Sequence, residues 1–160
     1  MNIKEKTCCF TGHREIPDFL YPALTKALED TLRGLIRQGV VYYGAGGALG
    51  FDTLAARTVL RLREESPQVR LILVLPCPEQ EKYWSAQDQK TYRNIMNHAD
   101  KVVFLSPSYT RGCMHQRNRH LVEESGVCVA YCTRSSGGTA YTVAYAKQKG
   151  LPVVNLAEFL

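Results

Sequence analysis

The sequence predicts an α/β fold in which a mostly parallel, doubly wound sheet lies between two layers of helices. Short apolar runs alternate along the chain with segments of helical periodicity. The apolar runs are continuously apolar rather than alternating, as expected for strands that are covered on both faces. This order indicates βαβ units, whose right-handed crossovers place the carboxyl ends of all the strands at one edge of the sheet.

Each predicted strand is an apolar run bounded by polar or glycine-rich segments. In order along the chain, the runs are Thr7–Thr11, Val40–Gly44, Val69–Leu75, Lys101–Leu105, Val127–Cys132 and Pro152–Leu156. The segments between them carry apolar stripes at helical spacing. The first stripe comprises Leu20, Leu24, Ala27, Leu28, Thr31 and Leu35, and the second comprises Phe51, Leu54, Ala55, Val59 and Leu62.

The third connection, residues 76–100, is the longest and is predicted to hold a short helix before the main one. No linker, repeat or low-complexity segment divides the 160 residues. Residues 1–160 are therefore predicted to form one domain, which is long enough to bury a proper core.

The composition is that of an ordinary globular protein, with 45% hydrophobic and 22% charged residues. No apolar run approaches the roughly 18 residues that span a bilayer, and the first residues lack the apolar core of a secretory signal. We therefore expect a cytoplasmic protein without a membrane partner. The sequence leaves open whether it forms a homo-oligomer.

The six cysteines predict neither a disulfide framework nor a metal site. Most lie in the apolar runs, where reduced cysteine behaves as a small hydrophobe, and there is no C-x-x-C motif. Cys113 and His115 have no second pair of ligands nearby in sequence. Cys77 and Cys113 follow strands, but no partner base marks either one as a nucleophile.

The formal net charge of +5 suits an anionic ligand without identifying one. Its densest basic run, Arg57–Arg63, lies in a helical pattern and fits a solvated helix face.

Ligands of an open α/β sheet bind in the crevice outside the carboxyl ends of the strands. Those ends carry the loops Thr11–Glu15, Gly44–Asp52, Pro76–Gln80, Ser106–Gly112 and Thr133–Thr139. The second and the last are glycine-rich and lead straight into a helix. Such a start directs free backbone N–H groups and the positive end of the helix dipole toward an anion.

The last loop is the stronger phosphate candidate. Gly137 and Gly138 allow a close approach of the backbone, and Ser136 and Thr139 add hydroxyl donors. The alternative is a tight turn with a helix cap that needs no ligand.

The second loop does not match a dinucleotide fingerprint. Gly44, Gly46 and Gly50 miss the G-x-G-x-x-G spacing, and no acidic residue closes the next strand. Asp52 falls in the first helical turn, where the dipole favours a carboxylate even without a ligand.

Polar residues after the first strand and on a later helix complete the candidate site. Arg14 has a planar guanidinium suited to phosphate, and His13 is suited to donating a hydrogen bond or stacking, although both also fit an ordinary polar loop. Asn118 shares a helical face with Met114 and Leu121, so its amide needs partners, either loop backbone or the ribose or base of a ligand.

No motif of a hydrolase, zinc protease or P-loop enzyme is present, and no sequence motif marks a cofactor.

Four segments in order, CCFTGHR, GAGGALGFDTLAA, MHQRNRHLVEES and SSGGTAYTVAYA, resemble the YpsA/YoqJ-like branch of the SLOG superfamily. That superfamily unites the Smf/DprA proteins and the cytokinin-activating LOG enzymes. The resemblance implies a Rossmann-like, three-layer α/β/α domain that recognises nucleotides or their derivatives. It also implies site residues: Gly12 and Arg14, then Gly46, Gly47 and Asp52, then Arg117 and Asn118 facing the pocket, with Gly137, Gly138 and Thr139 holding phosphate.

One departure from the LOG enzymes bears on catalysis. Their P-G-G-x-G-T-x-x-E signature ends in a catalytic glutamate, and Thr142 stands at that place here. A relocated carboxylate would have to come from Glu15, Glu79 or Glu124.

The preferred interpretation is a non-catalytic, sensor-like domain for a nucleotide derivative such as ADP-ribose, NAD or a nucleoside phosphate. One alternative is a LOG-type hydrolase or transferase acting at an N-glycosidic bond. The other is DprA-like binding of single-stranded DNA, for which Tyr109, Arg111 and Arg134 are the candidate contacts.

Overall fold

The centre of the molecule is a six-stranded sheet with the strand order β4-β3-β2-β1-β5-β6, in which every neighbouring pair is parallel. The computed structural model describes residues 1–160. The strands are β1 (Thr7–Gly12), β2 (Tyr42–Ala45), β3 (Arg70–Leu75), β4 (Lys101–Phe104), β5 (Val127–Tyr131) and β6 (Val153–Asn155). Each overlaps its predicted apolar run, so the predicted class and the parallel sheet are confirmed.

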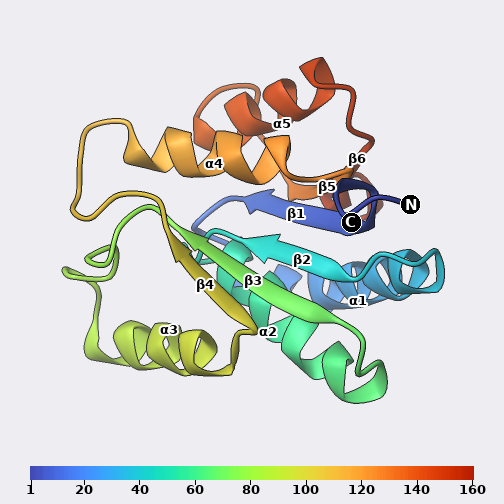
Figure 1. Ribbon diagram of the computed structural model, residues 1–160, viewed down its shortest axis with the longest axis horizontal. Coiled ribbons are helices and arrows are strands. Elements are labelled where there is room, and N and C mark those ends of the chain that lie inside the picture. Colours follow the sequence, from blue (N-terminus) through green and yellow to red (C-terminus); the bar gives the residue numbers. More distant parts are fainter.

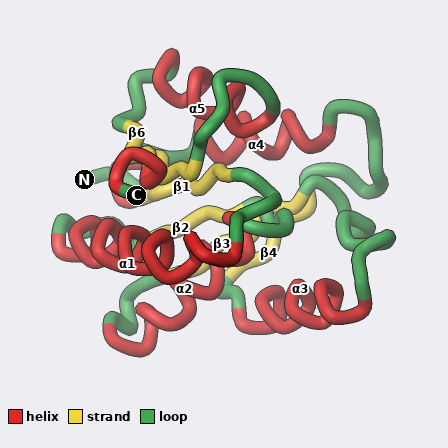
Figure 2. The backbone as a smooth tube through the Cα atoms, turned by 180° about the vertical axis from the view of Figure 1, so that it is seen from behind, coloured by secondary structure: helices red, strands yellow, loops and turns green.

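Helices cover both faces of the sheet (Figure 1). One layer consists of α1 (Tyr21–Arg37), α2 (Phe51–Glu65) and α3 (Ala86–His98), and the other of α4 (Cys113–Glu123) and α5 (Gly138–Gln148). The reverse view in Figure 2 shows the first layer in front of the strands. Short 3-10 helices lie at Lys4–Lys6, Asp18–Leu20 and Leu156–Phe159. None of the helices combines the length and the apolarity needed to cross a membrane.

The strand order places a switch point between β1 and β5. The chain adds β2, β3 and β4 successively on one side of β1, and α4 then carries it back to β5 on the other side. The connections on the two sides therefore diverge and leave a crevice at the carboxyl ends of β1 and β5. Gly12 and Tyr131 pair at this edge of the sheet.

The predicted apolar stripes face the core. Leu24 and Leu28 of α1 and Val59 and Leu62 of α2 are almost fully buried. They join strand residues in the larger of two apolar clusters, and a smaller cluster lies beneath α4 and α5. All six cysteines are free, and only Cys132 is not fully buried.

The long third connection differs from its prediction. It contains α3 but no preceding short helix, because residues 78–83 form turns. Isolated hydrogen bonds from Lys82 N to Glu79 O and from Trp84 N to Glu81 O close these turns without continuing into a helix.

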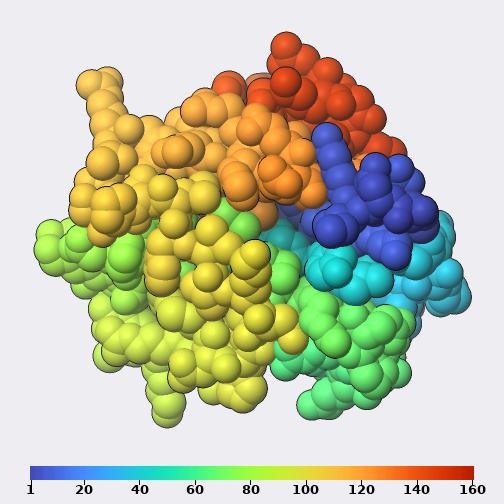
Figure 3. All heavy atoms as spheres, viewed as in Figure 1, coloured from blue at the N-terminus to red at the C-terminus, as the bar shows by residue number.

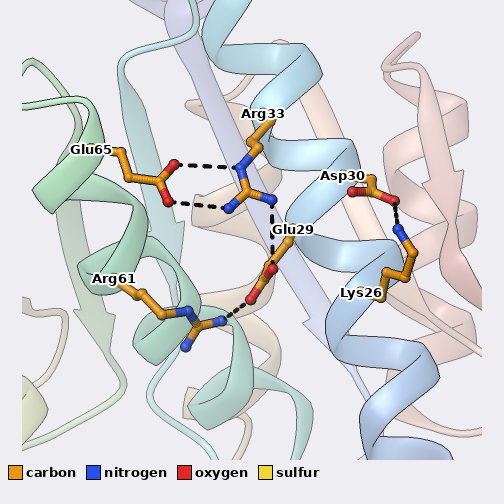
Figure 4. Close-up of polar contacts among 6 residues, drawn as sticks. All are labelled: Lys26, Glu29, Asp30, Arg33, Arg61 and Glu65. Carbon is orange, nitrogen blue, oxygen red and sulfur yellow. Dashed lines mark hydrogen bonds and ion pairs between the residues drawn. The ribbon is translucent and has the colours of Figure 1, made fainter.

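The basic run on α2 lies at the surface, where Arg57 and Arg61 are exposed. Figure 4 shows two ion pairs that join α1 and α2, since Arg61 contacts Glu29 and Arg33 lies 3.2 Å from Glu65. Within α1, Arg33 also lies 3.6 Å from Glu29. Such exposed pairs contribute only about 0–1 kcal/mol each. The structure therefore supports the interpretation of this run as a solvated helix face.

Candidate functional site

A cavity of about 410 Å³ opens at the switch point, where the carboxyl ends of β1 and β5 meet. Most of the predicted site residues line it: Gly12, His13, Arg14, Asp52, Arg117, Asn118, Ser136, Gly137, Gly138 and Thr139. Glu15, Ala48, His115 and Arg134 are also among the lining residues. The amino ends of α2, α4 and α5 all contribute to the wall.

Arg117 lines the cavity and is only 3% exposed. Its Nη1 donates to the carbonyl oxygen of Gly46, and its Nε donates to Asn118 Oδ1 at 2.7 Å. A weaker contact of 3.4 Å joins Nη1 to Gln80 Oε1. The guanidinium therefore ties α4 to the loop after β2 and to the loop after β3.

Asp52 is the buried carboxylate of the site. It is 6% exposed, and its Oδ2 accepts a hydrogen bond from Ala48 N at 3.3 Å, whereas its Oδ1 accepts none. Burial raises the pKa of the Asp52 carboxyl, and Arg117, the Ala48 amide and Arg14 oppose that shift. No ion pair joins Asp52 to an arginine directly, so its free oxygen is available to a donor in the cavity.

His13 links the loop after β1 to the loop after β5. Its Nε2 accepts a hydrogen bond from Thr133 N at 2.9 Å, so the ring is neutral and carries its proton on Nδ1. The ring also packs edge-on against Tyr131, with 5.4 Å between centroids. The sequence predicts a donor or a stacking group, and the structure adds that Nε2 accepts a hydrogen bond from the protein itself.

Acidification is expected to weaken the fold through His13. Burial, and after it the charge of Arg134, lower the pKa of His13. The unfolded chain therefore takes up a proton at a higher pH than the folded chain does, and stability falls as the pH drops below about 6.5. Unfolding in denaturant between about pH 8 and pH 5 should show this loss. His13→Gln, which keeps an acceptor for Thr133 N, should lose less stability than the wild type over that range.

The glycines of the second loop face protein rather than the cavity. A Cβ on Gly46 would lie 2.6 Å from Arg117 Nη1, and a Cβ on Gly47 would lie 2.6 Å from Leu75. Neither glycine lines the cavity, and this segment reaches the wall through Ala48 and Asp52 instead. These glycines therefore allow close packing of the loop against α4 and β3.

The loop before α5 is open by contrast. A Cβ on Gly137 or Gly138 would meet no atom within 4 Å, and no side chain caps the helix. The amides of the first turn have no intrahelical partner. These N–H groups therefore lie free beside Ser136 and Thr139 at the cavity wall.

Of the three glutamates considered as a replacement for the LOG catalytic glutamate, only one lines the cavity. Glu15 lines the cavity, whereas Glu79 pairs with Lys82 at 3.8 Å and Glu124 caps the far, carboxyl end of α4. Thr142, at the place of the LOG glutamate, is buried and donates to the carbonyl oxygen of Gly138.

The remaining candidates are spread more widely. Arg134 lines the cavity, but Tyr109 and Arg111 lie on the β4–α4 loop, which projects at the left of Figures 1 and 3. Cys77 and Cys113 are buried. No group of three or more His, Cys, Asp or Glu side chains is placed to hold a metal ion.

A model of the YpsA family, described as the YspA SLOG family, matches residues 10–152. The chain belongs to this family. A UPF0398 protein of Halalkalibacterium halodurans is 31% identical over 129 residues, covering 79% of this chain and 68% of that protein. The SPbeta prophage-derived protein YoqJ of Bacillus subtilis is 30% identical over 115 residues, covering 64% of this chain and 67% of YoqJ.

Solved structures show that the YpsA family chain shares its fold with DNA processing protein A. The Helicobacter pylori protein superposes with a TM-score of 0.64 at 17% identity, covering 96% of this chain and 70% of that one. The Streptococcus pneumoniae protein gives 0.66 at 16% identity and covers 94% of this chain, which spans 50% of the pneumococcal one. The predicted SLOG membership and Rossmann-like fold are therefore confirmed.

Proposed function

We propose that the cavity at the switch point binds a phosphate-bearing nucleotide derivative and that the domain acts as a sensor of that ligand. The observation that carries this proposal is that groups suited to phosphate and to hydroxyl donors meet at a single cavity. One cavity of about 410 Å³ gathers the open start of α5, the guanidinium groups of Arg14 and Arg134, and the buried Asp52 with a free oxygen. A helix start and arginines favour an anion, and a carboxylate favours hydroxyl donors.

The phosphate belongs at the start of α5. Amides of its first turn, with the Ser136 and Thr139 hydroxyls, surround space that no side chain fills. Arg14 and Arg134 are exposed at the same cavity, where each can turn its planar guanidinium toward phosphate oxygens. Asp52 Oδ1 then suits a ribose hydroxyl, because a hydrogen bond to the carboxylate stabilises a charge that burial disfavours.

We propose binding without catalysis. Thr142 occupies the place of the LOG glutamate, and its hydroxyl is already engaged by the helix backbone. A LOG-type reaction here would depend on Glu15. Release of free base from a nucleotide by the wild type, and its loss in Glu15→Gln, would contradict this part of the proposal.

Single-stranded nucleic acid is the second candidate ligand. The Helicobacter pylori DNA processing protein A, whose fold this chain shares, binds single-stranded DNA. Affinity for an oligonucleotide would fall steeply with salt concentration, because each phosphate contact releases counterions. An affinity that is nearly independent of salt would exclude a DNA-binding mode of this kind.

The test of the proposed site is a thermal-shift screen against ADP-ribose, NAD and nucleoside phosphates, followed by calorimetry on the ligands that stabilise the fold. Arg14→Ala is expected to weaken binding about tenfold or more, since a hydrogen bond to a charged group contributes roughly 1.5–3 kcal/mol. Gly138→Val should weaken it similarly, because the added methyl groups fill the open space before the first-turn amides.

Both variants should unfold at nearly the wild-type denaturant concentration. Arg57→Ala is the matched control, since Arg57 is exposed on α2 and makes no ion pair. Equal affinity of wild type and Arg14→Ala for every ligand of the screen would remove the site from this cavity.

A further inference from the structure

A row of three aromatic rings runs from the cavity wall along α4 and α5. The His115 ring packs edge-on against Tyr141, with 5.0 Å between centroids, and Tyr141 lies parallel to Tyr145 at 6.4 Å and 7°. His115 itself lines the cavity. The row therefore begins at the site proposed above and leads away from it over the surface.

The middle ring of the row, Tyr141, is accessible, and the Tyr145 ring behind it is held in place. Tyr141 lies in the first turn of α5, two residues after Thr139, and is 44% exposed. The Tyr145 hydroxyl donates to Glu123 Oε2 at 2.6 Å, and Lys149 Nζ lies 5.5 Å from the centre of its ring. Tyr141 thus offers exposed ring surface on a rigid support.

We propose that Tyr141, with His115 beside it, is the platform on which the nucleobase of the ligand stacks. The inference rests on the proposed function, because it takes the phosphate to lie at the start of α5. Thr139 and His115 line the cavity, and Tyr141 lies two residues after Thr139 and packs against His115, so its ring adjoins the proposed phosphate position. Stacking of a base on an aromatic ring is worth roughly 1–3 kcal/mol and tolerates every base.

A neighbouring cavity of about 370 Å³ is the competing place for the base. It shares His13, Glu15 and Arg134 with the first cavity and is also lined by Ile16, Pro17, Tyr131 and Thr133. Its aromatic residue, Tyr131, is only 3% exposed and already contacts His13 and Phe51. Tyr131 is therefore closed to a base, whereas Tyr141 is 44% exposed.

The same platform suits a nucleobase from either of two sources. A free nucleotide would use Tyr141 alone. A single strand would continue along the row, where Lys149 and Arg119 lie near Tyr145 and provide positive charge for its backbone. The salt dependence of binding distinguishes the two sources.

The experiment compares ligands with and without a base on matched variants. Calorimetry would measure ribose 5-phosphate, AMP, UMP and a thymidine oligonucleotide against wild type, Tyr141→Ala and Tyr141→Phe. Tyr141→Ala is expected to weaken AMP and UMP binding about tenfold and to change ribose 5-phosphate binding by less than about twofold. Tyr141→Phe should retain wild-type affinities, and Tyr83→Ala, which removes another highly exposed tyrosine, is the control.

The outcomes test the stacking platform and the proposed function separately. If Tyr141→Ala weakens ribose 5-phosphate as much as AMP, or leaves AMP unchanged, then Tyr141 is not the platform. If wild type binds ribose 5-phosphate as tightly as AMP, the proposed site stands and the platform falls. If wild type binds none of these ligands, the proposed function falls with it.

Discussion

Replacing Arg117 by methionine is expected to lower the free energy of unfolding by about 3 kcal/mol or more. The guanidinium is 3% exposed and donates to the Gly46 carbonyl oxygen and to Asn118 Oδ1. Methionine fills much of the same volume but supplies no donor, so the Gly46 carbonyl loses this partner. The nearby carboxylate of Asp52 then also remains buried and loses the larger of the two positive charges that lower its pKa, those of Arg117 and Arg14.

Equilibrium unfolding in denaturant measures this loss. Arg134→Met is the matched control, because Arg134 is an exposed arginine on the same cavity, and its loss should change stability by less than about 0.5 kcal/mol. The double variant Asp52→Asn, Arg117→Met should recover part of the loss, since it removes the uncompensated charge. A cost below about 1 kcal/mol for Arg117→Met, or no recovery in the double variant, would show that Arg117 is not structurally coupled to Asp52.

The burial of Arg117 cannot be predicted from local sequence. The pair Arg117 and Asn118 is a sequence clue, but the helical stripe with Met114 and Leu121 predicts Asn118 as its inward member. In the structure Asn118 is half-buried and Arg117 is the buried residue. Arginine is rarely buried without partners, and its main partner here is a backbone carbonyl 71 residues away in sequence. Only the tertiary fold brings that carbonyl within reach.

The fold itself was largely predictable, because continuous apolar runs and helical stripes are local signals. The turns at 78–83 were not, since nothing in their composition separates them from a short helix. The predicted strand ends carry most of the candidate residues, and in the structure these residues line one cavity at that edge of the sheet. The strand order, which decides that the loops after β1 and β5 are neighbours, depends on pairings between distant segments.

The environment of the two glycine-rich loops also cannot be predicted from the sequence. A glycine-rich loop at a helix start can face a ligand or protein, and composition does not distinguish the two. The loop before α5 is open, whereas the loop after β2 is packed. The two loops differ in the atoms that a Cβ added at each glycine would meet. The effect of such a Cβ on stability can be tested at Gly50.

Gly50→Ala is expected to destabilise the fold by about 2–3 kcal/mol, because two costs combine at this position. Its φ of +76° with a ψ of −119° is a conformation that residues with a Cβ rarely adopt. An added Cβ would also lie 2.6 Å from the carbonyl oxygen of His13 and closer still to that of Arg14. The His13 carbonyl accepts a hydrogen bond from Phe51 N, so the loop after β1 cannot move away without losing that bond.

Gly138→Ala is the matched control for this prediction, since Gly138 is also a glycine at a helix start but has open space around it. Denaturant unfolding should show Gly138→Ala within about 0.5 kcal/mol of the wild type. Because displacement of the first loop moves Arg14 and His13, Gly50→Ala should also weaken any ligand that binds Arg14. If Gly50→Ala proved as stable as Gly138→Ala, the first loop would have to be free to move at little cost. The cavity would then be assembled by its ligand rather than held open by the packing of α2 against β1.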